Sequence, residues 1–195
     1  DSVAVFKYKL MLSELYYDVG NYDKGALIGE ELLHKLKKLD RPIKVYLLYT
    51  LDKIYKELQL HDKQLEIRRQ LKGLGEKVVL YDIYAELGLY RQAMMEYTIA
   101  NKSKLGNGED KFYKAEYYNN LGTYLLKDGS IYTALKDIEI AHQSIMDYLN
   151  NESLISSEDF NEAIYLKGQI ESNLGKCKMF QNKFDEAIPY LEAGV

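Results

Sequence analysis

The sequence GSIYTA at residues 129–134 is one copy of a six-residue phrase that recurs along this chain and indicates its fold. Each copy carries an aromatic or His side chain near its middle, and most copies open with Gly or Asn and end on a small residue. Four further copies follow the same plan: GNYDKG at 20–25, QLHDKQ at 59–64, GLYRQA at 88–93 and NKFDEA at 182–187. Recurrence of this kind is typical of repeat proteins, in which helical hairpins stack on one continuous core.

Helix-forming segments flank these phrases. Residues 111–127 place apolar side chains at helical spacing, and Gly129 supplies the left-handed residue that ends such a helix. Residues 41–59 carry a similar stripe, and Asp40 and Pro42 are suited to cap and start that helix. No useful stretch alternates polar and apolar residues, so we expect no strands. The stripes consist of Leu47, Leu48, Leu51, Ile54, Tyr55 and Leu58, and of Tyr117, Tyr118, Leu121 and Leu125.

The last residue of each phrase marks a close approach of two helices. Gly25, Ala93, Ala134 and Ala187 are small enough to fit between two backbones, whereas Gln64 departs from the rule. We therefore expect the second hairpin to be looser or more widely spaced than the others.

The pattern resembles the tetratricopeptide repeat, and the resemblance covers essentially the whole chain. It implies an all-α fold, a right-handed superhelical array of about five antiparallel helix hairpins. The large aromatic early in the first helix is missing except at Tyr118, and no proline closes the repeats. The matching residues are Leu121, Gly122, Tyr124, Gly129, Ala134 and Ala141; Leu174, Gly175, Phe184 and Ala187; and Leu80, Tyr84, Gly88, Tyr90, Ala93, Tyr97 and Ala100.

The phrases are spaced unevenly. Their last residues stand at 25, 64, 93, 134 and 187, so the gaps are 39, 29, 41 and 53 residues against 34 in the family. Long hairpins of this kind resemble the extended variants of bacterial signalling proteins. We expect one domain over residues 1–195, with repeats at roughly 3–39, 41–72, 74–104, 110–150 and 157–195.

Composition excludes several classes of function. A formal net charge of -4 gives no electrostatic case for contact with nucleic acid, and no apolar run approaches the ~20 residues needed for membrane insertion. The single cysteine, Cys177, excludes an internal disulfide and fits the cytoplasm or a bacterial periplasm, between which the sequence does not decide. Because the chain starts at Asp1 and ends within a helical pattern, we expect it to be a piece of a longer protein.

The resemblance also implies where a partner binds, because the first helices of tetratricopeptide hairpins line a concave surface that holds an extended peptide. Helical geometry places residues 46, 49 and 53 on one face, opposite the apolar stripe. Lys56, Glu116, Gln169 and Phe180 share the transferred faces. The chain lacks the opening Lys–Asn pair of members that bind chaperone tails, so we do not expect that ligand. The candidate binding residues are Tyr46, Tyr49, Lys53, Asn119, Asn120, Thr123, Lys127, Asn173 and Lys176.

No arrangement typical of an active site or cofactor site is found in the sequence. The three histidines are far apart, and none has a second ligand at metal-binding spacing. We therefore expect a non-catalytic module without cofactors that binds a protein or peptide; the sequence leaves a homodimer open. The resemblance to the family favours a regulatory or sensor segment of a bacterial histidine kinase or transcription regulator. A free-standing scaffold and an intracellular receptor for a peptide signal stay open as alternatives.

Overall fold

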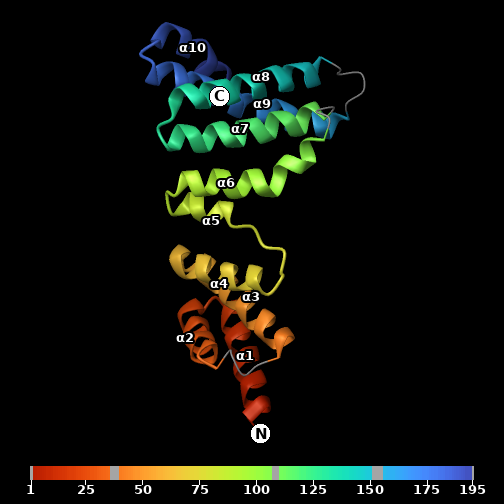
Figure 1. Cartoon of the computed structure of the whole chain (residues 1–195), viewed down its shortest axis with the longest axis vertical. Coiled ribbons are helices and arrows are strands. Elements are labelled where there is room, and N and C mark those ends of the chain that lie inside the picture. Colours follow the sequence, from red (N-terminus) through yellow and green to blue (C-terminus); the bar gives the residue numbers. More distant parts are fainter. Residues whose placement is uncertain (1, 36–39, 107–109, 151–155, 195) are drawn as a thin grey trace. The chain divides into compact units, whose positions relative to one another are not determined.

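A computed structural model describes residues 2–35, 40–106, 110–150 and 156–194, and every regular element in those ranges is a helix (Figure 1). The all-α prediction is therefore confirmed. The chain divides into two compact units, Asp1–Gly88 and Leu89–Val195, which are described one at a time. The single continuous domain expected from the sequence stays a prediction.

The first unit contains two helical hairpins followed by a short helix. The hairpins pack on one another around a core of fully buried leucine and isoleucine side chains, among them Leu47, Leu51, Ile54 and Leu71. Most of the apolar stripe predicted in residues 41–59 is thus confirmed, with Leu58 only half-buried. The elements are α1 (Ser2–Asp18), α2 (Tyr22–Leu33), α3 (Arg41–Glu57), α4 (His61–Gly73) and α5 (Tyr81–Glu86).

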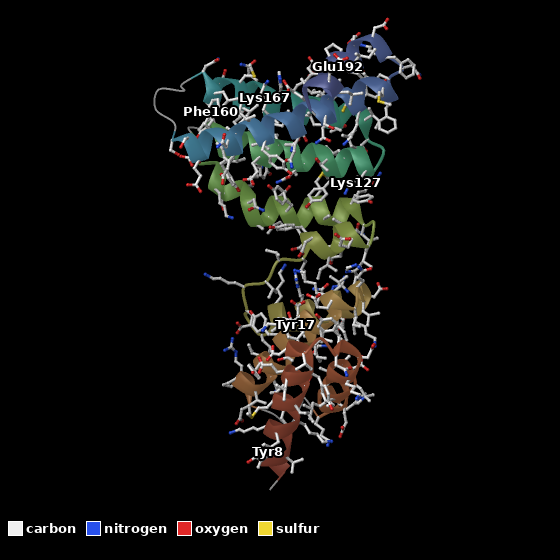
Figure 2. All side chains as sticks on the ribbon, turned by 180° about the vertical axis from the view of Figure 1, so that it is seen from behind. Tyr8, Tyr17, Lys127, Phe160, Lys167 and Glu192 are labelled. Atoms are coloured by element: carbon white, nitrogen blue, oxygen red, sulfur yellow. The ribbon has the colours of Figure 1, made fainter. Side chains whose placement is uncertain are left out.

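The second unit begins with a single helix and continues with two long hairpins. Its core lies where Ile138 and Ile145 meet Ile170 and Cys177, all with no exposed surface, and the side chains of each unit fill the spaces between its helices (Figure 2). The elements are α6 (Tyr90–Asn101), the 3-10 helix η2 (Lys102–Leu105), α7 (Lys111–Lys127), α8 (Ile131–Leu149), α9 (Ser157–Phe180) and α10 (Phe184–Ala193).

The recurring phrase is the turn between two helices in all five places. Its first residue has a positive φ each time: 76° at Gly20, 55° at Gln59, 71° at Gly88, 84° at Gly129 and 59° at Asn182. At four of these turns the next amide donates to the carbonyl five residues earlier, which closes the helix in a Schellman motif. These bonds run from Asn21 to Tyr16 (2.8 Å), Leu60 to Tyr55 (2.9 Å), Ser130 to Leu125 (2.8 Å) and Lys183 to Lys178 (2.9 Å).

Small residues allow the helices of a hairpin to pack closely. A Cβ atom on Gly122 of α7 would lie 2.3 Å from Cγ1 of Ile138 in α8, and one on Gly175 of α9 would lie 2.6 Å from Cγ of Leu191 in α10. Ala134 and Ala187, at the ends of their phrases, are also fully or nearly fully buried. Close packing at these positions explains why the repeat needs small side chains there.

The start of α3 corrects one prediction. Pro42 lies in its first turn as expected, but the Asp40 side chain makes no capping hydrogen bond to the helix. The backbone of Asp40 is extended and its carbonyl accepts the amide of Lys44 at 3.0 Å, so only the main chain of Asp40 caps the helix. Asp110 and Ser156, by contrast, do cap α7 and α9 with their side chains.

Candidate functional site

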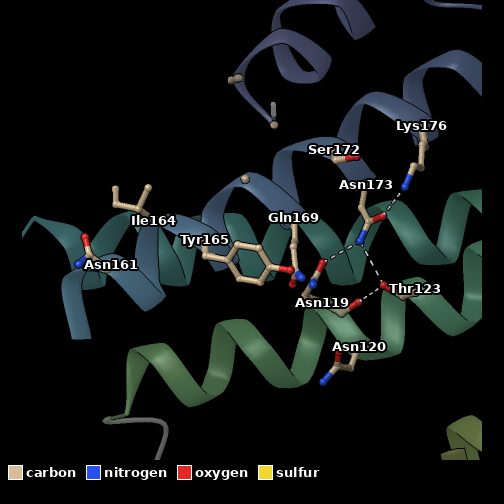
Figure 3. Close-up of a pocket in the computed structure, with 13 residues that line it drawn as sticks. Asn119, Asn120, Thr123, Asn161, Ile164, Tyr165, Gln169, Ser172, Asn173 and Lys176 are labelled. Carbon is tan, nitrogen blue, oxygen red and sulfur yellow. Dashed lines mark hydrogen bonds between the residues drawn. The ribbon is translucent and has the colours of Figure 1, made fainter. Parts of the chain in front are cut away.

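An open groove lies along α7 and α9 in the second unit, and the end of α10 closes one side of it (Figure 3). Its volume is about 810 Å³, within the range of ligand-binding clefts. Five of the nine candidate binding residues line it, which brings together positions up to 57 residues apart. The lining residues are Asn119, Asn120, Thr123, Asn161, Ile164, Tyr165, Gly168, Gln169, Ser172, Asn173, Lys176, Ala193 and Gly194.

A hydrogen-bonded set of polar side chains forms the floor of the groove. The Asn173 amide nitrogen donates to Oδ1 of Asn119 at 3.0 Å and to Oγ1 of Thr123 at 3.1 Å. The Thr123 hydroxyl in turn donates to the Asn119 carbonyl at 2.8 Å, and Lys176 Nζ lies 3.5 Å from Oδ1 of Asn173 (Figure 3). These contacts fix the orientation of both carboxamides, which are nearly buried.

One donor of this set makes no hydrogen bond to the described residues. Nδ2 of Asn119 has no acceptor among the described residues, although Oδ1 of the same side chain accepts from Asn173. Gln169, one helical turn before Asn173, lines the groove with a carboxamide that is also unpaired within the described part of the chain. A ligand with backbone carbonyl and amide groups could satisfy both side chains.

The wall of the groove offers apolar and aromatic surface. Tyr165 of α9 is 71% exposed and Ile164 beside it is 46% exposed. In Figure 3 the Tyr165 side chain points toward the Gln169 side chain. An exposed Tyr can cover a partner with its ring and still bond it through its hydroxyl.

The groove continues toward the N-terminal ends of the same two helices. A second hollow of about 620 Å³ shares Asn161, Tyr165 and Gln169 with the first and adds Phe112, Glu116, Glu162 and Leu166. Carboxylates therefore lie at one end of the combined groove, and the ammonium group of Lys176 lies near the other. From Glu162 to Lys176 the helix rises about 21 Å, enough for about six residues of extended peptide.

Asn120 and Lys127 each contact a tyrosine of α6. The amide of Asn120 donates to the Tyr97 hydroxyl of α6 at 2.9 Å. Burial raises the pKa of Tyr97 to about 12, and the bond from Asn120 opposes that rise. The ammonium group of Lys127 lies 5.7 Å from the ring centre of Tyr90, at the end of α7 (Figure 2), and Lys127 does not line the groove.

The three candidate residues of the first unit make separate contacts with neighbouring side chains. Tyr46 lines a small apolar hollow of about 300 Å³ on α1 and α3, and its hydroxyl donates to Glu14, which raises the pKa of Tyr46 to about 12. The Tyr49 hydroxyl lies 3.5 Å from Oε2 of Glu76. Lys53 Nζ lies 5.9 Å from the ring centre of Tyr17.

Several groove residues were not predicted from the sequence. Transfer from the family gave Gln169, Asn173 and Lys176 on α9 but not Asn161, Tyr165 or Ser172. Helical spacing could have found them, because 161, 165, 169, 172 and 176 follow one another at three or four residues along one face of α9.

The one cysteine of the chain belongs to the core of the second unit. Cys177 is fully buried in the core, and burial raises the pKa of its thiol to about 11, so it is held as an unreactive thiol. The described ranges contain no cluster of three or more His, Cys, Asp or Glu side chains placed to hold a metal ion. Of the helices in those ranges, none has the length and apolar character that crossing a bilayer requires.

Comparison with known proteins gives the fold. No protein-family model matches the chain, and no curated protein sequence matches it. Solved structures do match. A mutant of MamA superposes with a TM-score of 0.57 at 15% identity, covering 97% of this chain and 90% of the other. BtubC (BKLC) from P. vanneervenii gives 0.62 at 19% identity, covering 98% and 78%.

A third structure carries the repeat in its description. The nearly identical TPR-like repeats of a P. anserina protein assigned to the kinesin light chains give a TM-score of 0.58 at 14% identity, covering 96% of this chain and 92% of the other. At these identities the likeness establishes the fold alone. The chain has the fold of tetratricopeptide-type helical repeats, and the resemblance seen in its sequence is confirmed at that level.

Proposed function

We propose that this chain is a non-catalytic protein-interaction module that binds an extended peptide segment of a partner in the groove along α7 and α9. The observation that carries the proposal is the fixed polar floor of Asn119, Thr123 and Asn173 beneath an open groove with exposed Tyr165. Prearranged polar groups lower the ordering cost of binding, and an exposed aromatic supplies contact area.

Each part of the groove has a separate task in this proposal. The free amide of Asn119 and the carboxamide of Gln169 bond the peptide backbone, which tolerates many sequences. Tyr165 and Ile164 cover an apolar side chain of the peptide. The carboxylates of Glu116 and Glu162 at one end and Lys176 at the other favour a peptide whose charges run in the opposite order.

Peptide selection against the full chain tests the proposal. Peptides enriched from a random library are resynthesised with a fluorophore, and their Kd is measured by fluorescence polarisation. Replacing Tyr165 by Ala should weaken binding about tenfold or more, as for a central aromatic contact. The matched control is Tyr132→Ala on α8, a tyrosine 77% exposed that does not line the groove, which should change Kd less than about twofold.

Two results would count against the groove. Selection could enrich no peptide that binds in solution, or the Tyr132 and Tyr165 variants could weaken binding equally. In the second case the partner surface lies elsewhere on the molecule, as a scaffold that uses its convex face would require.

The finer role remains the one predicted from the sequence, a regulatory or sensor segment of a larger bacterial signalling protein. A receptor for a peptide signal would depend on the groove residues, whereas a scaffold in an assembly would depend on convex or end surfaces. The reading frame on either side of this segment distinguishes them, since a kinase or DNA-binding domain in the same frame supports the sensor role.

A further inference from the structure

A second polar pocket lies wholly within the first unit, among α3, the start of α4, and α5. It has a volume of about 350 Å³, at the lower end of the range for small-molecule sites. Its lining is strongly polar, with one apolar side chain among eight. The lining residues are Lys56, Gln59, His61, Gln64, Arg68, Asp82, Ile83 and Glu86.

Gln64 is the residue that broke the repeat pattern in the sequence. The equivalent position carries Gly or Ala in the other four hairpins, and a glutamine here places a carboxamide where close packing needs only a small side chain. Gln64 is 3% exposed and lines the pocket, yet its side chain makes no hydrogen bond with any described residue. The amide oxygen and nitrogen of Gln64 reach the surface of the pocket, where they are free to bond a ligand.

His61 provides a second unsatisfied group on the same turn of α4. It precedes Gln64 by three residues and therefore shares its face of the helix. Its Nδ1 is buried and has no hydrogen-bond partner among the described residues. Two independent polar groups at one pocket thus lack partners, which indicates a ligand rather than a packing defect at one side chain.

The charges of the pocket identify the kind of ligand. Arg68 is already engaged, because Nε donates to Asp52 at 2.8 Å, and NH1 donates to Asp82 at 2.9 Å and to the Val79 carbonyl at 3.0 Å. Arg68 therefore shares its single positive charge between Asp52 and Asp82.

Lys56 and Glu86 remain, and neither forms an ion pair with a described residue. The lining therefore presents one free ammonium group and one free carboxylate to a ligand. A simple cation or anion would satisfy only one of them, whereas a ligand carrying both charges satisfies both.

We propose that this pocket binds a small zwitterion of the amino-acid class, a free α-amino acid or a dipeptide. Lys56 pairs with its carboxylate, Glu86 pairs with its ammonium group, and Gln64 and His61 bond its remaining polar atoms. The site is separate from the groove of the second unit, so either proposal can fail without the other.

Titration of the uniformly ¹⁵N-labelled full chain with L-glutamine and, separately, with glycylglycine tests this inference. The expected result is a saturable shift of backbone amide signals in residues 59–64 and 82–86 with at least one of the two probes. The two titrations distinguish a free amino acid from a dipeptide. Acetate and methylammonium, which carry one charge each, should not give these shifts at the same concentration.

Two variants connect the shifts to the pocket. Gln64→Ala restores the residue type of the other hairpins, so the fold should be kept while affinity falls at least about tenfold, the loss typical of an unmade buried hydrogen bond. Glu86→Gln should weaken binding to a similar extent, and Glu57→Gln, an exposed acid on α3 outside the pocket, should not. The inference is overturned if neither probe gives saturable shifts, or if Gln64→Ala binds as the natural chain does.

Discussion

Replacing Gly122 by Ala tests the register of the α7–α8 hairpin. The new Cβ would lie 2.3 Å from Cγ1 and 3.0 Å from Cδ1 of Ile138, and 3.3 Å from the carbonyl oxygen of Ala134. Ile138 is fully buried and cannot turn into solvent, so the backbones must separate. Overpacking of this kind lowers the free energy of unfolding by about 1–3 kcal/mol, while the better helix propensity of Ala raises it by up to about 1 kcal/mol. The expected loss in the free energy of unfolding is therefore about 0–3 kcal/mol.

The same substitution at a second glycine separates the effect of the clash from that of helix propensity. Gly168 lies inside α9, and its added Cβ would meet nothing closer than 3.8 Å, at the carbonyl oxygen of Gly194. Gly168→Ala gains the same propensity without the clash, so Gly122→Ala should be less stable than Gly168→Ala by about 1–3 kcal/mol. Urea unfolding followed by circular dichroism measures both. Equal stability of the two variants would refute the packing of Gly122 on Ile138.

Two further predictions concern buried groups. Cys177 should react with a thiol reagent at neutral pH at least about 100-fold more slowly in the native chain than in urea, because a pKa of about 11 leaves little thiolate and the side chain is buried; equal rates would place it at the surface. Arg68→Ala should lower the free energy of unfolding by about 3 kcal/mol. The Arg68 side chain is only 12% exposed, and its removal leaves the Asp52 carboxylate unpaired. Arg91→Ala, at a side chain 77% exposed, should cost about 0–1 kcal/mol; similar losses would show that burial does not set the strength of these pairs.

The turns and helices were predictable because their causes are local. A left-handed residue and the amide that follows it lie within one six-residue phrase. All five copies have the positive φ, and four of them close the helix with the same hydrogen bond. The helix predicted over residues 111–127 has those bounds in the structure. The prediction that the Asp40 side chain caps α3 was wrong, because capping depends on the side-chain rotamer, which the neighbouring sequence does not determine.

The groove was predictable only in part, because its floor is made by side chains far apart in the sequence. Asn120 and Asn173 hold the same repeat position, yet Asn120 bonds Tyr97 on α6 and Asn173 bonds Asn119 on α7, 54 residues away. The repeat pattern gives the face of the helix on which each side chain lies. The partner depends on what the neighbouring helix presents, and that differs from one repeat to the next.

A residue that departs from the repeat pattern can indicate a function, whereas a residue that follows the pattern is explained by helix packing. Ala134 and Ala187 are explained completely by helix packing, so they say nothing about ligands. Gln64 holds the same position, and packing does not explain a carboxamide there. The sequence predicted only a looser hairpin, and that spacing stays a prediction. Because the Gln64 side chain is buried, unpaired and beside a free ammonium group and a free carboxylate, it indicates a requirement other than folding, and recognition of a small polar molecule meets that requirement.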